Sequence, residues 1–149
     1  MERFIGNIDA KTDAKGRVFI PASFRKIMQT AGDSQLVLRM DTYKDCLVLY
    51  PYSLWDKEVD EVRSKLNKWD EEEQELFRMF VTGVEILEMD ASGRILIPKR
   101  YLQKAQIGNE VKFVGMIDNI EIWSRSKLET SLMDEDKFRA GVRKFLANK

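Results

Sequence analysis

The stretch DAKGRVFIPASFRK, residues 13–26, contains an acid, a glycine–arginine pair and a proline that opens a basic segment. A second stretch, DASGRILIPKRYLQK at residues 90–104, repeats this order of residue types 77 positions later. The pairs in register are Asp13/Asp90, Gly16/Gly93, Arg17/Arg94, Ile20/Ile97 and Pro21/Pro98. An internal repeat of this kind indicates two supersecondary units that complete each other's core.

The local chemistry of each copy predicts a tight turn followed by a strand and a short helix. The glycine adopts a positive φ at little cost, and the aspartate can accept hydrogen bonds from the turn amides. Pro21 suits the start of a helix, and Gly32 suits its end. Further on, SQLVLRM and CLVLY predict a β-hairpin around the polar loop DTYKD. CLVLYPYSLWDK also parallels NIEIWSRSKLET in the second copy. The chain as a whole therefore predicts an α+β fold.

Three amphipathic segments complete the predicted organisation. Apolar residues recur at helical spacing after Ser53, which we expect to cap the helix: Trp55, Val59, Val62, Leu66 and Trp69. The segment DEEEQELFRMFVTG predicts a second helix that begins on acids and forms a hairpin with the first. A last helix places four apolar residues on a face that we expect to point inward: Phe138, Val142, Phe145 and Leu146. We expect a first half at residues 1–54, a helical hairpin at 55–83, a second half at 84–127 and a C-terminal helix at 128–149.

Composition excludes several classes of site. The 149 residues include no histidine, which removes the histidine-dependent catalytic triads and imidazole metal sites. Cys46 is the only cysteine, so an internal disulfide is excluded; a small buried hydrophobe or a reactive thiol are its two interpretations. We find no metal-spaced cluster or phosphate loop, and we expect no enzyme activity, cofactor or metal. Neither a signal peptide nor a membrane span fits, so the expected location is the cytoplasm.

The net charge of zero hides a strong asymmetry along the chain. Residues 1–32 carry six bases and three acids, a net of +3, and residues 90–112 carry five bases and two acids, again +3. Residues 56–89 carry eleven acids and five bases, a net of −6. Local patches govern the encounter with a polyanion more than the total charge does. The basic charge therefore lies in the two repeated stretches.

The turn D-x-x-G-R is the candidate site. Arg17 and Arg94 each follow a glycine, and an arginine fork can read guanine O6 and N7 in the major groove. Lys15 is placed to hold a phosphate. Alternatively, Asp13 and Asp90 pair with these arginines only to fix the turns. The two interpretations are compatible, because a carboxylate that orients an arginine also prepares it to bind.

Other residues of the repeated stretches have two interpretations as well. Four cations follow the prolines and are either phosphate contacts or parts of solvated helix faces: Arg25, Lys26, Lys99 and Arg100. Three tryptophans are either core residues or stacking platforms for bases, and their positions on apolar stripes favour the core: Trp55, Trp69 and Trp123.

The doubled motif DAKGRVFIP and DASGRILIP, the FIG near the start, and FVG with IEIWS in the second half resemble the MraZ family of bacterial transcriptional regulators. The turn motif itself is similar to that of the AbrB-type swapped-hairpin regulators. The resemblance covers essentially the whole chain. It departs from the family pattern at Thr12 and Met89, where a leucine is common, and at Ser92, which replaces the lysine of the first copy.

The resemblance implies two tandem AbrB-like halves in a pseudo-twofold β-barrel with peripheral helices, and assembly into a ring-like homo-oligomer. It implies binding to double-stranded DNA at short G-rich promoter repeats of the division and cell-wall gene cluster, including the protein's own promoter. It also implies a nucleoid-associated location. The DNA-binding residues carried over are Lys15, Gly16, Arg17 and Arg94, and the turn-orienting residues are Asp13, Asp90 and Gly93.

Two other classes stay open at this point. One is a ring-forming scaffold that binds a protein partner and no DNA; the salt dependence of DNA affinity separates it from a regulator. The other is a small hydrolase that uses Asp13 and Asp90, which the absence of histidine disfavours. The sequence leaves open whether a regulator of this kind represses or activates, how many subunits a ring has, and whether an effector binds.

Overall fold

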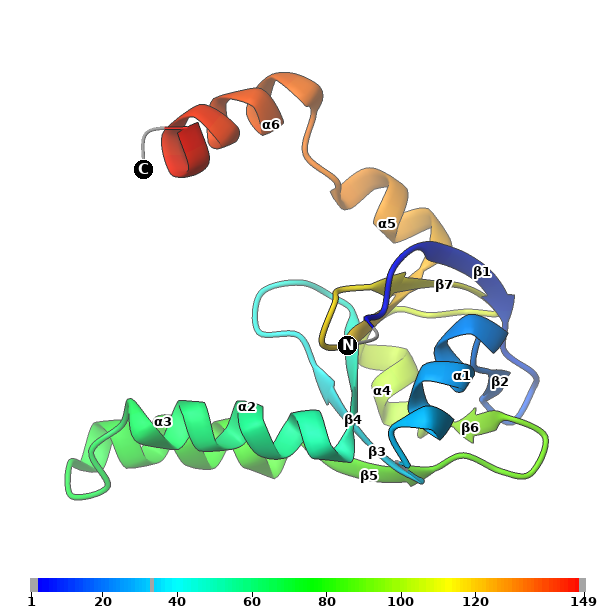
Figure 1. The fold of residues 1–149 in the computed structure, drawn as a ribbon, viewed down its shortest axis with the longest axis horizontal. Helices are drawn as coiled ribbons and strands as arrows, with labels where there is room; N and C mark the ends of the chain where they lie inside the picture. Colours follow the sequence, from blue (N-terminus) through cyan, green and yellow to red (C-terminus); the bar gives the residue numbers. More distant parts are fainter. Residues whose placement is uncertain (1–2, 33, 148–149) are drawn as a thin grey trace.

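The computed structural model describes residues 3–32 and 34–147. Figure 1 shows the arrangement of the elements. The first half contains β1 (Asn7–Lys11), β2 (Arg17–Phe19), α1 (Ala22–Thr30), β3 (Gln35–Met40), β4 (Leu47–Pro51), α2 (Tyr52–Ser64) and α3 (Glu71–Thr82). The second half contains β5 (Glu85–Glu88), β6 (Arg94–Leu96), α4 (Lys99–Lys104), β7 (Glu110–Gly115), β8 (Ile120–Ser124), α5 (Arg125–Ser131), α6 (Glu135–Val142) and a π-helical end, η1 (Arg143–Ala147).

The strands form one six-stranded sheet in the order β1-β7-β8-β4-β3-β5 and one two-stranded ribbon, β2-β6. All pairings are antiparallel. The order is symmetric between the halves: β1 pairs with β7 of the second half, and its counterpart β5 pairs with β3 of the first half. Each half therefore lends its first strand to the other. The α+β class with two tandem, exchanged halves is confirmed, whereas the strand ladder stays open and does not close into the expected barrel.

The β2-β6 ribbon lies on the local symmetry axis. Val18 faces Ile95 across the ribbon, and these two residues are equivalent positions of the repeat. The flanking bonds follow the same symmetry: the Ile20 amide donates to the Gly93 carbonyl at 3.0 Å, and the Ile97 amide donates to the Gly16 carbonyl at 2.9 Å. A three-residue strand makes few hydrogen bonds alone, so each turn is held by the strand of the other half.

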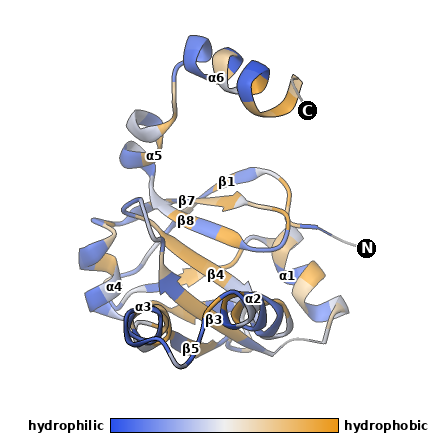
Figure 2. Ribbon diagram, turned by 90° about the vertical axis from the view of Figure 1, so that its left-hand side faces the viewer, coloured by the Kyte–Doolittle hydropathy of each residue, from blue (hydrophilic) through white to orange (hydrophobic). Residues whose placement is uncertain are grey.

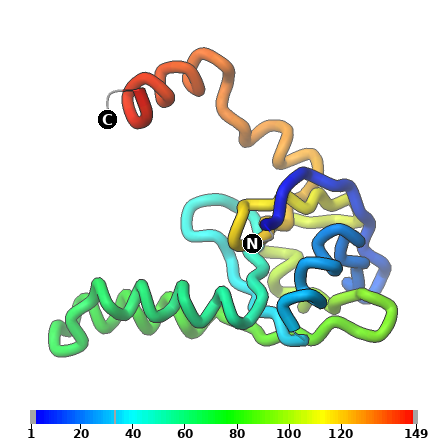
Figure 3. The backbone as a smooth tube through the Cα atoms, viewed as in Figure 1, coloured from blue at the N-terminus to red at the C-terminus, as the bar shows by residue number. Residues whose placement is uncertain are grey.

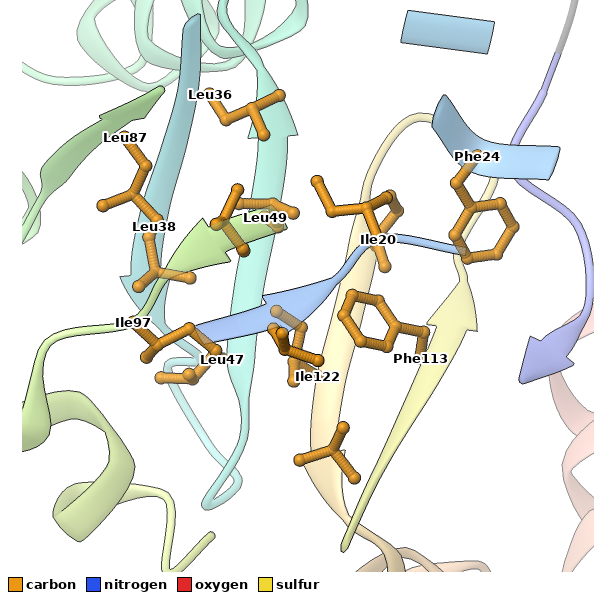
Figure 4. Close-up of a cluster of buried hydrophobic side chains, with 14 of the residues drawn as sticks. Ile20, Phe24, Leu36, Leu38, Leu47, Leu49, Leu87, Ile97, Phe113 and Ile122 are labelled. Atoms are coloured by element: carbon orange, nitrogen blue, oxygen red, sulfur yellow. The ribbon is translucent and has the colours of Figure 1, made fainter. Parts of the chain in front are cut away.

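Both halves contribute to one hydrophobic core (Figure 4). The inward side chains of the ribbon, Val18 and Ile95, are almost fully buried and pack over the six-stranded sheet. Phe4 and Phe24 meet edge to face, with ring centroids 5.5 Å apart. The core is completed by fully buried residues from both halves, among them Ile20, Leu36, Leu38, Leu47, Leu49, Ile97, Phe113, Ile120 and Ile122. Shared burial makes the halves one folding unit.

The helices α2 and α3 form the predicted hairpin and run side by side away from the sheets (Figure 1). Trp55 is buried and stacks on Phe80 with ring centroids 5.6 Å apart and an interplanar angle of 11°. Two expectations were wrong here. Helix α2 begins at Tyr52, and its N-cap is Pro51 where Ser53 was expected. The helix ends at Ser64, so Trp69 lies in the connecting loop with 85% of its surface exposed.

The C-terminal segment departs most from expectation. Figures 2 and 3 show α6 standing apart from the sheets, beyond α5. The apolar residues of α6 and η1 are exposed, and the expectation of an inward face was wrong: Phe138, Val142, Phe145 and Leu146 are 53%, 37%, 55% and 69% exposed. The break at Leu132, whose backbone is extended, ends α5 and directs the chain away from the core. Within the described residues, none of the helices has the length and apolar character needed to cross a membrane.

Candidate nucleic-acid interface

The two D-x-x-G-R turns have the same internal geometry. The Asp13 carboxylate accepts hydrogen bonds from the backbone amides of Lys15 and Arg17, both at 2.9 Å, and from Arg17 Nε at 2.7 Å. Gly16 follows with a φ of +92°. These contacts close the turn because a single carboxylate ties together three donors that lie within four residues.

The second turn repeats the pattern at equivalent positions. Asp90 accepts from the amides of Ser92 and Arg94 and from Arg94 Nε, each at 2.9 Å. Gly93 has a φ of +90°. The replacement of lysine by Ser92 therefore leaves the backbone geometry unchanged and removes only a positive charge.

Hydrogen bonding lowers the pKa of both turn aspartates. The largest cause at Asp13 is the backbone amide of Arg17, and at Asp90 it is the backbone amide of Arg94. Each arginine side chain acts in the same direction through its hydrogen bond and its charge. Both carboxylates are thus ionised at neutral pH, as the ion pairs require.

The outer face of the β2-β6 ribbon presents both arginines together. In register, Arg17 faces Leu96 and Phe19 faces Arg94. Phe19 and Leu96 are each 53% exposed, and the Arg94 guanidinium carbon lies 5.7 Å from the Phe19 ring centroid. The bonds to the aspartates use Nε of each arginine, so the two terminal amino groups of each fork lie outside these bonds. The face combines two oriented cations with two apolar side chains.

The four candidate phosphate contacts divide into two kinds. Arg25 donates from Nη1 to the Ile20 carbonyl at 2.6 Å, and Arg100 pairs with Glu85 and lies over the Tyr101 ring. Lys26 is exposed in the second turn of α1, and Lys99 is exposed at the first residue of α4. The two lysines therefore stay open to both interpretations, a solvated helix face or a phosphate contact, whereas both arginines are held by internal partners.

Sequence reasoning missed Phe19 and Leu96 as members of this surface. Each lies in a run of apolar residues that reads as core, and only the alternation of a strand separates them from buried Val18 and Ile95. Strand alternation along RVF and RIL would have predicted them, because successive side chains of a strand point to opposite faces of the sheet.

The tryptophans and the cysteine lie away from this surface. Trp55 and Trp123 are buried, as the core interpretation expects. Cys46 is fully buried, and burial raises the pKa of its thiol far above its usual range. Its sulfur lies within 4.8 Å of carboxylate oxygens of Asp41 and Glu121, a group that the sequence spacing did not indicate. Asp41 accepts from two loop amides, and Glu121 accepts from Trp123 Nε1 at 2.8 Å, so both acids serve the local fold.

Comparisons with known proteins agree with the internal repeat. The family model of the MraZ protein, described as antitoxin-like, matches the chain twice, over residues 4–78 and 79–143. A relative from Bacteroides fragilis, named "Transcriptional regulator MraZ", is 50% identical over 146 residues, which covers 98% of this chain and 92% of the relative.

Other relatives carry the same name. The one from Phocaeicola vulgatus is 52% identical over 136 residues, covering 91% of this chain and 88% of its own. The one from Coxiella burnetii is 33% identical over 122 residues, covering 82% and 80%. These relatives are named as regulators of transcription and not as enzymes. Two family matches in tandem and half-identical relatives along nearly its full length show that the chain belongs to the MraZ family of transcriptional regulators.

Proposed function

We propose that the chain is a sequence-specific DNA-binding regulator that reads double-stranded DNA with the outer face of its β2-β6 ribbon. The observation that carries the proposal is the joint presentation of Arg17 and Arg94, each oriented by its own aspartate. An arginine fork held in one geometry suits bidentate hydrogen bonds to guanine O6 and N7. A flexible arginine would lose more conformational entropy on binding.

The size of the ribbon suits a single major groove. Arg94 faces Phe19, two residues from Arg17 along β2, which is about 7 Å at the rise of an antiparallel strand. A two-stranded ribbon fits in the major groove of B-DNA, which is about 12 Å wide. Both arginines can therefore reach base edges of the same short site, and guanines are the bases that this chemistry favours.

Residues around the ribbon supply the sequence-independent part of the interaction. Lys15 lies in the first turn, and Lys26 and Lys99 are exposed on the helices that follow β2 and β6. Lysines in these places suit phosphate contacts, which position a protein on the duplex without reading sequence. Ser92 has no such charge, so we infer that the first turn contributes more to affinity than the second.

We further propose that several subunits assemble into a ring-like homo-oligomer whose ribbons meet successive G-rich promoter repeats, including those upstream of the protein's own gene. The support is the resemblance to family members together with the smallness of one ribbon. Each bound ribbon raises the effective concentration of the next. A cytoplasmic, nucleoid-associated location follows from this function.

Fluorescence anisotropy with labelled promoter DNA and a scrambled duplex tests the proposal. We expect preference for the native sequence and a steep loss of affinity with salt. Arg17→Ala should lower specific affinity by roughly 10- to 100-fold, in line with the discrimination of a bidentate contact, and leave binding to the scrambled duplex nearly unchanged. Lys44→Ala, in the exposed loop after β3, is a matched control. Equal or absent binding to both duplexes would favour a scaffold that binds a protein partner.

A further inference from the structure

The two halves of the chain differ in what their C-terminal helices contact. In the first half, α2 and α3 lie side by side, and the stacked rings of Trp55 and Phe80 hold them together. Their counterparts in the second half, α5 and α6, are separated by an extended break and do not form a hairpin. Residues 132–147, which we call the C-terminal arm, therefore lack the helical partner that the repeat provides in the first half.

The arm exposes a large apolar surface to water, which disfavours an isolated short helix. Five of its large apolar side chains are at least half exposed: Leu132, Met133, Phe138, Phe145 and Leu146. A helical segment of 13 residues is marginal alone, and contiguous exposed apolar patches mark interaction sites. The arm is thus one side of an interface.

The α2-α3 hairpin provides a matching surface. Leu76 and Met79 on α3 are 57% and 78% exposed, and Glu72 lies on the same helical face, four residues before Leu76. An exposed apolar strip on a helix suits an amphipathic helix with aromatic side chains, as the arm is.

The charges of the two surfaces are opposite. Residues 52–82 carry nine acids and five bases, a net of −4. The whole arm, residues 132–147, carries four bases and three acids, a net of +1. Its three acids all precede Lys137, so residues 137–147 form a basic end with four bases and no acids: Lys137, Arg139, Arg143 and Lys144. Two copies of a hairpin repel each other and so do the basic ends of two arms, whereas the basic end of an arm and a hairpin attract. Opposite potentials on apolar patches of one chain favour a contact between the arm of one copy and the hairpin of another.

We propose that the C-terminal arm docks on the α2-α3 hairpin of a second copy of this chain, with Phe138 and Phe145 packed against Leu76 and Met79. The contact joins different surfaces of two identical subunits, so it is heterologous and generates a closed ring or an open filament. This inference rests on the homo-oligomer that is part of the proposed function, and it identifies the contact that joins neighbouring subunits. It leaves the β2-β6 ribbon uncovered.

A charge exchange tests the joint with full-length protein and no DNA. Glu72→Lys makes the hairpin repel the arm, and Arg143→Glu makes the arm repel the hairpin. We expect each variant alone to lose about tenfold or more in association constant, measured by sedimentation velocity at low salt. In an equimolar mixture of the two variants, each unchanged arm meets an unchanged hairpin and each reversed arm meets a reversed hairpin, so opposite charges face each other at every contact. In the double variant, arm and hairpin are both reversed, so every contact again joins opposite charges. Both should therefore assemble like the wild type.

Controls separate charge from folding and from DNA recognition. Lys44→Glu and Asp118→Lys reverse exposed charges elsewhere and should leave assembly unchanged. Phe138→Ser combined with Phe145→Ser should abolish assembly while the circular dichroism of the fold and the anisotropy of a single-site duplex persist. The proposal is overturned if the wild type is a monomer, if the single reversals assemble normally, or if the mixture stays dissociated. Normal binding of the single-site duplex in those cases would leave the DNA-reading proposal intact.

Discussion

Arg25 lies across Gly93: a Cβ atom added to Gly93 would meet the Arg25 Cδ atom at 2.5 Å. At the equivalent place in the other half, a Cβ on Gly16 would lie 2.7 Å from the Ile97 carbonyl oxygen and 3.2 Å from Leu102 Cδ1. Arg25 and Leu102 are equivalent positions of the repeat, 77 residues apart. Each half thus braces the turn of the other half, with a cation on one side and an apolar side chain on the other.

This asymmetry predicts different costs for the two glycine substitutions. Gly16→Ala combines a φ of +92° with a collision against backbone, and we expect a loss of roughly 2–3 kcal/mol in unfolding free energy. Gly93→Ala has a similar φ, but it meets a side chain, which can shift more readily than backbone, so the loss should be about 1–2 kcal/mol. Urea denaturation measures both. Gly108→Ala, where an added Cβ meets nothing, is the control. Equal losses at both turns would contradict the assigned contacts.

Arg25 and its neighbour Lys26 should behave differently when each is changed to alanine. Arg25 donates to the Ile20 carbonyl at 2.6 Å, and its loss should lower the unfolding free energy by about 1–2 kcal/mol because that carbonyl loses a charged donor. Lys26 is exposed, and its loss should leave stability within about 0.5 kcal/mol.

For DNA binding, the expected effects of Arg25→Ala and Lys26→Ala are reversed, with the larger effect at Lys26. Lys26→Ala should reduce the salt dependence of affinity by about one phosphate contact on any sequence. Denaturation and anisotropy on the same two variants supply the measurement. A stable Arg25→Ala protein with a reduced salt slope would show that Arg25 contacts phosphate and does not serve the turn.

The parts of the fold that follow from local rules were predictable from the sequence. Both turns, the hairpin of β3 and β4, and the hairpin of α2 and α3 follow from glycine position, residue alternation and helical spacing. The exchange of β1 and β5 between the halves came only from the family resemblance, since strand partners far apart in sequence leave no local pattern.

The prediction of a buried C-terminal helix was wrong, although it used the same rule of helical apolar spacing. Phe138 and Val142 have the spacing of a core-facing stripe, yet both are exposed. Hydrophobic periodicity shows that a face is to be buried and does not show which molecule buries it. For Trp69, the stripe continued by spacing alone beyond Ser64, where the helix ends. The candidate site was readable as a motif, but Phe19 and Leu96 needed the strand register.

The two turn aspartates predict how stability responds to acid. Because hydrogen bonds lower the pKa of Asp13 and Asp90 in the fold, the unfolded chain binds their protons more readily. Their contribution is therefore fully present above the ordinary aspartate pKa of about 3.9 and is lost as the pH falls through the lower pKa of the folded state.

We expect Asp13→Asn to lower the unfolding free energy at neutral pH, because an amide cannot accept three hydrogen bonds and pair with Arg17 as a carboxylate does. The difference from the wild type should be constant from about pH 5 to 8 and shrink below about pH 4. Urea denaturation at several pH values gives this difference, with Asp118→Asn as a control for the loss of one negative charge. A difference that does not change on acidification would mean that the ionised carboxylate does not stabilise the turn.

The stability of the α2-α3 hairpin should depend on one aromatic stack. The Phe80 ring stacks on Trp55. The guanidinium carbon of Arg39 on β3 lies 5.1 Å from the centroid of the same ring. Phe80→Ala removes both contacts, and for a half-buried ring we expect a loss of about 2–3 kcal/mol, below the range for a fully buried phenylalanine. Leu76→Ala, at an exposed position on the same helix, should cost about 0.5 kcal/mol or less.

The same pair of variants distinguishes a folding role from an interface role. Hydrogen exchange should be faster across α2 and α3 in Phe80→Ala and unchanged in β7 and β8 of the sheet. The reason is that the stack packs with Val37, Val48 and Tyr50 of β3 and β4 in a cluster separate from the shared core. Leu76→Ala should leave hydrogen exchange in the monomer unchanged and weaken assembly if the arm of a neighbour packs there. Faster exchange in β7 and β8 of Phe80→Ala would show that the hairpin and the core unfold together, and then the loss of assembly in hairpin variants would report folding rather than contact.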